Sequence, residues 1–132
     1  MEQYVLMLQT DPDDKYITES TLAELSKDIP VQFIAGLDEV DKTITASGQP
    51  VVILVNDKGH AQYGPPLIKK IKSHPVYGHV PVVILGEVTT SDYIRQCYRA
   101  GASTFITKPS TVAATRKKIE TFFTYWFDVA EV

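Results

Sequence analysis

Three uninterrupted apolar runs limit the possible folds of this 132-residue chain more than any other feature. They are YVLML at residues 4–8, VVILV at residues 51–55 and PVVIL at residues 81–85, and none alternates apolar with polar positions. Strands that are apolar on both sides are typical of a parallel sheet covered by helices on both faces. Shorter runs at residues 31–35 and 104–107 predict two further strands. We therefore expect a central sheet of five strands.

Helical patterns fill the stretches between these runs. Strand and helix alternate five times with short connections, which predicts a single α/β domain over residues 1–132, with a doubly wound parallel sheet and helices on both faces. Ligands of such sheets bind beyond the carboxyl ends of the strands. The functional residues are therefore expected there. The predicted helices cover residues 16–27, 37–45, 91–100 and 111–129, and one more follows the turn at residues 64–66.

The composition argues against several classes of protein. A formal net charge of -3 and a pI near 5.5 argue against nucleic-acid binding, which needs a basic surface. No apolar run approaches the ~18 residues that span a bilayer, and Met1 opens no signal-peptide pattern, so we expect a cytoplasmic protein without a membrane partner. Cys97 lies on the apolar side of its helix and should be a buried, inert thiol. No role is expected for the histidines, His60, His74 and His79.

Polar residues follow the carboxyl ends of the predicted strands. Their order, the eight-residue spacing from Asn56 to Gly64 and the Gly101-Ala102 pair before the last strand resemble the receiver domain of bacterial response regulators. The resemblance covers essentially the whole chain, and it implies a flavodoxin-like sheet with the strand order 2-1-3-4-5. The segments at the strand ends are Gln9-Thr10-Asp11-Pro12-Asp13-Asp14, Asn56-Asp57-Lys58-Gly59, Gly86-Glu87 and Thr107-Lys108-Pro109.

The resemblance assigns a role to several of these positions. Receivers hold Mg²⁺ with an acidic pair, accept a phosphoryl group on an aspartate, and use a hydroxyl residue, a lysine and a switch aromatic to respond to it. Here the acidic pair falls at Thr10 and Asp11, the acceptor at Asn56, the hydroxyl at Gly86, the lysine at Lys108 and the aromatic at Phe105. Three of these positions keep the residue type of the family: Asp11, Lys108 and Phe105.

Asn56 is the departure with the largest chemical consequence. Its amide nitrogen lone pair is delocalised and its carbonyl oxygen is a poor nucleophile, so Asn56 should not be phosphorylated. With two of three carboxylates lost, Mg²⁺ should bind only weakly, through Asp11, or not at all, and no other cofactor is expected. We predict that Lys108 instead contacts Asp11 and the Asn56 carbonyl. The resemblance also implies a cis bond before Pro109.

The neighbouring acidic residues have simpler expected roles. Asp13 and Asp14 are expected to cap the first helix. Glu87 is placed to reach over the pocket. Asp57 is expected to be an exposed loop acid. Because Gly86 has no side chain to sense a ligand, Phe105 should be a static side chain packed in the core and should not act as a moving switch.

These residues favour a stand-alone pseudo-receiver in two-component signalling, which is not an enzyme and acts by protein contact. Its expected partners are a histidine kinase, a phosphotransfer protein, another signalling protein or its own copy. The last helix carries Tyr125, Phe127 and Val129 beside its core stripe, which indicates a contact surface. The resemblance to receivers implies that this surface forms a homodimer through the last two helices.

Two alternatives stay open at the level of sequence. In the first, Asp57 accepts the phosphoryl group, and Asp11 together with Asp13 or Glu87 rebuilds a magnesium site. In the second, the crevice serves an enzyme or a small-molecule binder, although the chain has no glycine-rich phosphate loop and no Ser/His/Asp set.

Overall fold

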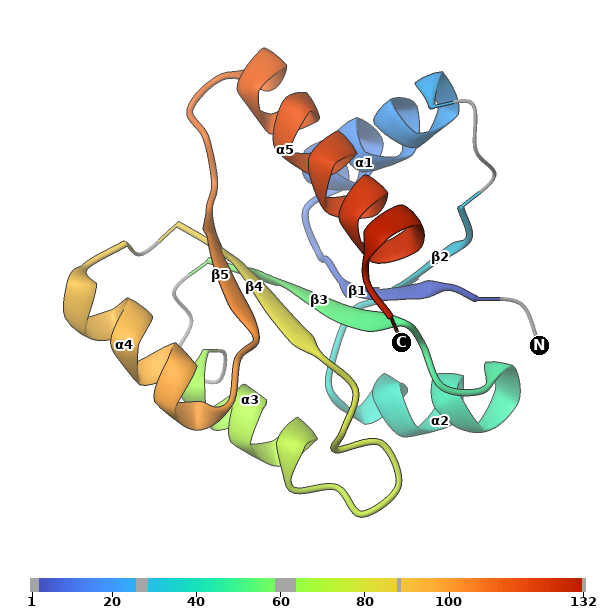
Figure 1. Cartoon of the computed structure of the whole chain (residues 1–132), viewed down its shortest axis with the longest axis vertical. Helices are drawn as coiled ribbons and strands as arrows, with labels where there is room; N and C mark the ends of the chain where they lie inside the picture. The colour runs from blue at the N-terminus through green and yellow to red at the C-terminus, as the bar shows by residue number, and fades with distance from the viewer. Residues whose placement is uncertain (1–2, 26–28, 59–63, 88, 132) are drawn as a thin grey trace.

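The structure is a computed structural model that describes residues 3–25, 29–58, 64–87 and 89–131. Its strands form one parallel sheet in the order β2-β1-β3-β4-β5, which confirms the predicted topology (Figure 1). β2 and β5 are therefore the edge strands. The strands are β1 (Val5–Leu8), β2 (Val31–Ile34), β3 (Val52–Asp57), β4 (Val82–Gly86) and β5 (Thr104–Thr107).

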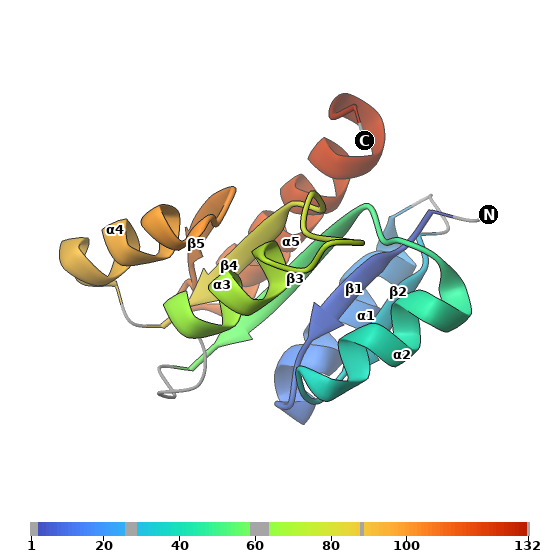
Figure 2. The same cartoon turned by 90° about the horizontal axis from the view of Figure 1, so that it is seen from below.

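Helices cover both faces of this sheet, as a doubly wound fold requires (Figure 2). α2, α3 and α4 pack on one face, and α1 and α5 pack side by side on the other. The helices are α1 (Pro12–Glu24), α2 (Asp38–Ser47), α3 (Pro65–Lys72), α4 (Ser91–Ala100) and α5 (Val112–Thr124), and α5 runs on into a short π-helical segment, η1 (Tyr125–Val129). No helix in the described ranges is long and apolar enough to cross a membrane.

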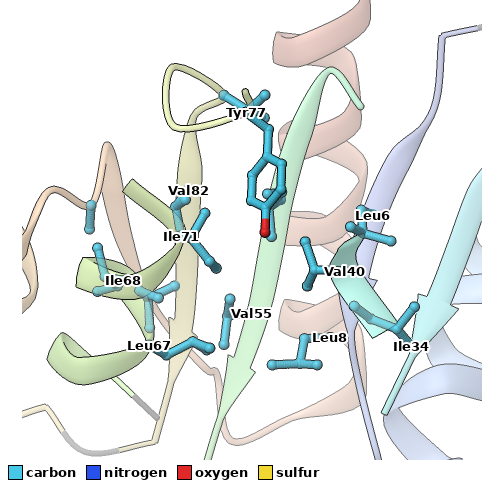
Figure 3. Packing of buried hydrophobic residues seen from close by; sticks show 14 of the residues in the cluster. Leu6, Leu8, Ile34, Val40, Val55, Leu67, Ile68, Ile71, Tyr77 and Val82 are labelled. Atoms are coloured by element: carbon cyan, nitrogen blue, oxygen red, sulfur yellow. The ribbon is translucent and has the colours of Figure 1, made fainter. Parts of the chain in front are cut away.

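Two buried clusters, one on each face of the sheet, hold these layers together. Because successive strand residues point to opposite faces, Leu6, Leu8 and Val55 meet α2 and α3, and Figure 3 shows them around Val40 and Leu67. The alternate residues of the same strands face α1 and α5. This burial on both faces explains why the runs are apolar throughout.

The first helix begins four residues earlier than the sequence pattern predicted. Asp11 caps it, because its Oδ1 accepts hydrogen bonds from the backbone N–H groups of Asp13 (2.9 Å) and Asp14 (3.3 Å). The expectation that Asp13 and Asp14 would be the caps is therefore wrong. Pro12 follows Asp11 in the first turn, where a proline costs no hydrogen bond, and this moves the helix start forward. The predicted end at residue 27 lies outside the described residues.

Side chains cover part of the open edge at β5. The backbone N–H of Phe105 donates a hydrogen bond to the Tyr98 hydroxyl of α4 at 3.0 Å. The backbone oxygen of Thr107 accepts one from Lys118 Nζ of α5 at 2.8 Å. α4 and α5 are thus each tied to the backbone of this strand.

Candidate functional site

The end of β3 sends two neighbouring polar side chains to opposite faces of the sheet. Asn56 lies on the α1 and α5 side, where its Nδ2 donates hydrogen bonds to Gln9 Oε1 (2.7 Å) and Asp14 Oδ2 (3.3 Å). Asp57 is on the α3 and α4 side, and its carboxylate accepts a hydrogen bond from the Tyr93 hydroxyl of α4. β3 runs through both residues, so Asp57 is a buried strand residue with 1% exposure, and its expected role as an exposed loop acid is wrong.

The groups around Asn56 form the site that we call the Asn56 pocket. It contains two amides, three carboxylates and two lysines, all contributed by the carboxyl ends of the strands and the start of α1. This is the edge of the sheet where a doubly wound fold places its ligands. The residues of the Asn56 pocket are Gln9, Asp11, Asp14, Asn56, Lys58, Glu87 and Lys108.

Gln9 is the pocket residue next to Asn56 that sequence reasoning missed. Its side chain is buried, and its Oε1 accepts hydrogen bonds from Asn56 Nδ2 and from the Asp11 N–H (3.0 Å). Thr10, which was aligned with the acidic pair, is exposed. The alternation along β1 could have revealed this, because Met7 faces α1 and α5, and Gln9 is two residues further on.

Lys108 meets carboxylates other than the one predicted. Its Nζ lies 2.5 Å from Asp14 Oδ2 and 3.2 Å from Glu87 Oε1, so Glu87 does reach over the pocket. Burial acts to lower the pKa of Lys108, but the hydrogen bonds to these two carboxylates raise it overall. The predicted contact of Lys108 with Asp11 and the Asn56 carbonyl is wrong, because Asp11 is held by its capping role and by a second lysine.

That second lysine is Lys58, which forms an ion pair with Asp11. The hydrogen bond from Lys58, followed by those from the backbone N–H groups of α1, lowers the pKa of Asp11 from 3.8 to about 2. The same hydrogen bond raises the pKa of Lys58. Both groups are therefore charged at neutral pH, and the cap of α1 is also one half of an ion pair.

The donor set of the Asn56 pocket does not fit Mg²⁺, which the receiver fold implies. Magnesium requires several oxygen ligands in near-octahedral geometry. The carboxylates of Asp11 and Asp14 already face ammonium groups, and Gln9 Oε1 already accepts two hydrogen bonds. Two buried atoms lack a partner among the described protein atoms, and one of them, Gln9 Nε2, is a donor that repels a cation. The other, Asn56 Oδ1, supplies a single oxygen.

Within the described ranges, no group of three or more His, Cys, Asp or Glu side chains is placed to hold a metal ion. His74 instead stacks on Tyr77 at a centroid distance of 3.8 Å, and its Nε2 lies 3.3 Å from Asp41. His79 is exposed, and His60 lies outside the described residues. Cys97 is fully buried as predicted, and burial, with Asp57 nearby, raises the pKa of its thiol to about 11.

The Lys108–Pro109 bond is trans, so the predicted cis bond is wrong: no peptide bond in the described part of the chain is cis. The trans form is the ordinary preference of a bond before proline, by roughly 0.5–1 kcal/mol. Lys108 needs no unusual backbone here, because Asp14 and Glu87 hold its ammonium group in the pocket.

The chain has the fold of response-regulator receiver domains. Its structure matches the phosphorylated cyanobacterial phytochrome response regulator RcpA with a TM-score of 0.86 and 19% identity, over 99% of this chain and 98% of that one. The Mn²⁺-bound form of response regulator Rcp1 gives 0.86 and 16%, over 99% of each chain. A response regulator from Hahella chejuensis gives 0.84 and 21%, also over 99% of each chain.

The sequence comparisons give a shorter match. No protein-family model matches the chain. A stretch of 56 residues, 42% of this chain, is 34% identical to the 3′,5′-cyclic-nucleotide phosphodiesterase regA of Dictyostelium discoideum. That stretch spans 7% of the phosphodiesterase. The similarity therefore concerns a small part of that protein.

Proposed function

We propose that this chain is a pseudo-receiver that works in two-component signalling by protein contact, without accepting a phosphoryl group. The observation that carries the proposal is the Asn56 pocket. An amide stands at the acceptor position, and both lysines of the pocket are already engaged by carboxylates.

The first support is the missing nucleophile. Phosphoryl transfer to a receiver needs a carboxylate oxygen that attacks in line. Asn56 offers an amide whose Nδ2 donates to Gln9 and Asp14, and its carbonyl oxygen is a weak nucleophile. Asp57 is no substitute, because it lies on the other face of the sheet from Lys108 and accepts a hydrogen bond from Tyr93.

The second support is electrostatic. The Asn56 pocket holds Lys58 on Asp11 and Lys108 between Asp14 and Glu87, so its own ammonium groups take the place of a divalent cation. An incoming phosphoryl group would have to break a carboxylate–lysine pair and then face the freed carboxylate. Breaking a partly buried pair in this way is unfavourable.

The partners that fit this function are proteins of the same signalling systems: a histidine kinase, a phosphotransfer protein or a second copy of the chain. A groove of about 600 Å³ runs between β5 and α5. Its aromatic side chains are Phe122, Tyr125 and Trp126, and Lys117 and Lys118 also line it. Tyr125 is 49% exposed, as a contact residue would be. We assign the chain no catalytic reaction, and we place it in the cytoplasm, where such partners work.

The test is intact mass after incubation with acetyl phosphate and Mg²⁺. The wild-type chain should gain no phosphoryl mass. Asn56→Asp should gain some, and the triple variant Gln9→Asp, Asn56→Asp, Lys58→Met should gain more, because it restores the nucleophile and frees the cation site. Gln49→Asp, which adds a carboxylate at an exposed amide elsewhere, is the matched control and should stay unlabelled.

A labelled wild-type chain would contradict the proposal. If Asp57→Ala then abolished the labelling, the acceptor would be one residue further along, and the chain would be a working receiver.

A further inference from the structure

Asp57 and Tyr93 join the end of β3 to α4 on the face of the sheet opposite to the Asn56 pocket. The Tyr93 hydroxyl donates a hydrogen bond to Asp57 Oδ2. Asp57 is 1% exposed, so the bond is made in a buried environment, where leaving a partner unpaired is costly. Burial, and next the bond to Asp57, raise the pKa of Tyr93, so its hydroxyl remains a donor at neutral pH.

Gly64 leaves the space that this hydrogen bond needs. A Cβ at position 64 would lie 2.1 Å from the Tyr93 hydroxyl oxygen and 3.4 Å from Asp57 Oδ2. The backbone φ of Gly64 is +69°, a conformation that favours glycine. Any other side chain at the start of α3 would push Tyr93 away from Asp57.

Gly86 does the same for a second ring, that of Phe105. A Cβ at position 86 would lie 2.3 Å from Phe105 Cζ, so the ring lies where a side chain of the β4 end would otherwise be. Phe105 also meets Tyr93 edge to face, with ring centroids 6.3 Å apart and planes at 85°. This arrangement is attractive for two aromatic rings.

The two rings therefore connect four elements, because they belong to α4 and β5 and contact β3 and β4. Tyr93 ties α4 to β3, Phe105 fills the space above β4, and the Phe105 N–H is itself bound by Tyr98 of α4. Both rings pack against the buried cluster on this face of the sheet. None of these contacts involves a residue of the Asn56 pocket.

We propose that Asp57, Tyr93 and Phe105 form an internal anchor that fixes α4 against β5 whatever the state of the Asn56 pocket, so that partners meet one constant α4–β5 surface. This inference rests on the proposed phosphorylation-independent function and adds its regulation: the surface is always presented. Asp57 is then a positioning residue for α4. The Phe105 ring occupies the place of a side chain at position 86, so the end of β4 provides no side chain that could connect the anchor to the Asn56 pocket.

Hydrogen–deuterium exchange measured by mass spectrometry tests the anchor peptide by peptide. Tyr93→Phe removes one hydroxyl and should raise exchange in α4 about fivefold, since a buried hydrogen bond contributes on the order of 1 kcal/mol. Exchange in α1 should not change. Tyr125→Phe, at an exposed tyrosine, is the matched control and should leave α4 as it is.

Two further variants separate the anchor from general stability. Gly86→Ala should expel the Phe105 ring and raise exchange in β5 and α4. Lys108→Met disturbs the Asn56 pocket and should leave α4 exchange at the wild-type rate.

Three outcomes would contradict the proposed anchor. The first is an equal rise in exchange along the whole chain of Tyr93→Phe, and the second is unchanged α4 exchange in both Tyr93→Phe and Gly86→Ala. The third is a change of α4 exchange in Lys108→Met. The exchange experiment contains no phosphoryl donor, so its outcome does not depend on phosphorylation. If the acetyl phosphate experiment labelled the wild-type chain, the proposed function would be refuted, and the exchange data would still test the anchor separately.

Discussion

At the scale of single residues, the Asn56 pocket combines three ion pairs with two amides. Each lysine has a carboxylate partner, and Asp11, whose pKa is lowered by its contact with Lys58, is also the cap of α1. The Asp11–Lys58 ion pair therefore lies at the start of α1, and its contribution can be measured as a change in the free energy of unfolding.

The Asp11–Lys58 pair should make stability depend on acid in a defined window. The folded-state pKa of Asp11 is about 2 against 3.8 for the free group, so its contribution to the free energy of unfolding is complete above about pH 3.8 and is lost as the pH falls toward 2. Asp11→Asn keeps a good capping residue and removes the charge. The stability difference between wild type and Asp11→Asn should therefore shrink between these two pH values in urea unfolding experiments.

Glu120→Gln is the control for that measurement, because Glu120 is an exposed carboxylate of α5. Its stability difference from wild type should change little over the same range. A difference for Asp11→Asn that stayed constant from pH 5 to pH 2 would mean that Lys58 does not hold Asp11 in solution.

Part of the site was predictable from single residues and part was not. Asn56, Lys108 and Glu87 lie at the carboxyl edge of the sheet, as predicted, because each stands at or just after the end of a strand. Asp14 was expected to cap α1, but the cap is Asp11, and this turns Asp14 toward Lys108. The sequence did not predict a role for Tyr93. Its contact with Asp57 depends on how α4 is rotated about its axis, and residue spacing alone does not determine that rotation.

At the scale of elements, capping residues decide where the helices begin. Thr111 is the cap of α5: its Oγ1 accepts a hydrogen bond from the Ala114 N–H at 3.1 Å. α5 carries Phe123, one of the most deeply buried side chains of the molecule. The start of α5 should therefore matter to the stability of the whole domain.

Thr111→Ala should lower the free energy of unfolding by about 1 kcal/mol, because it leaves a backbone N–H of the first turn without its partner. Thr111→Ser keeps the hydroxyl and should stay close to wild type. Ser110→Ala, at the exposed neighbouring residue, is the control. Urea unfolding followed by circular dichroism measures all three, and an unchanged Thr111→Ala would show that this cap is not needed.

Strands were easier to predict than helix boundaries, for a physical reason. An apolar run must be buried on both faces, so its position follows from the sequence. A helix end depends on which polar side chain reaches a free N–H, and several candidates stood before α1. β3 also runs two residues further than its apolar run, because Asn56 and Asp57 stay in register with Leu85 and Gly86.

At the scale of the whole molecule, alternation of strand and helix was enough to predict the sheet order once the resemblance was taken into account. The groove between β5 and α5 was only partly predicted: the surplus aromatic residues of the last helix indicated a contact surface, but its lysine lining depends on how α5 lies over β5. The proposed self-association can be examined at this surface.

Tyr125→Asp places a charge among the aromatic side chains of the groove and should shift the chain toward the monomer in sedimentation velocity. Tyr16→Asp is the matched control, because Tyr16 is 68% exposed on α1, outside the groove. If both variants sediment like the wild type at every concentration, the groove does not join two copies, and a heterologous partner is the remaining occupant.

The covered edge at β5 has a consequence for the amounts in which such a protein can exist. An exposed edge strand invites the strands of other molecules to add to it, and this starts aggregation. Tyr98 and Lys118 bind two backbone groups of β5, and so obstruct that addition. A protein that works by stoichiometric contact, as we propose for this chain, has to be as abundant as its partners. With its edge blocked in this way, the chain can accumulate to such levels with less tendency to form fibrils.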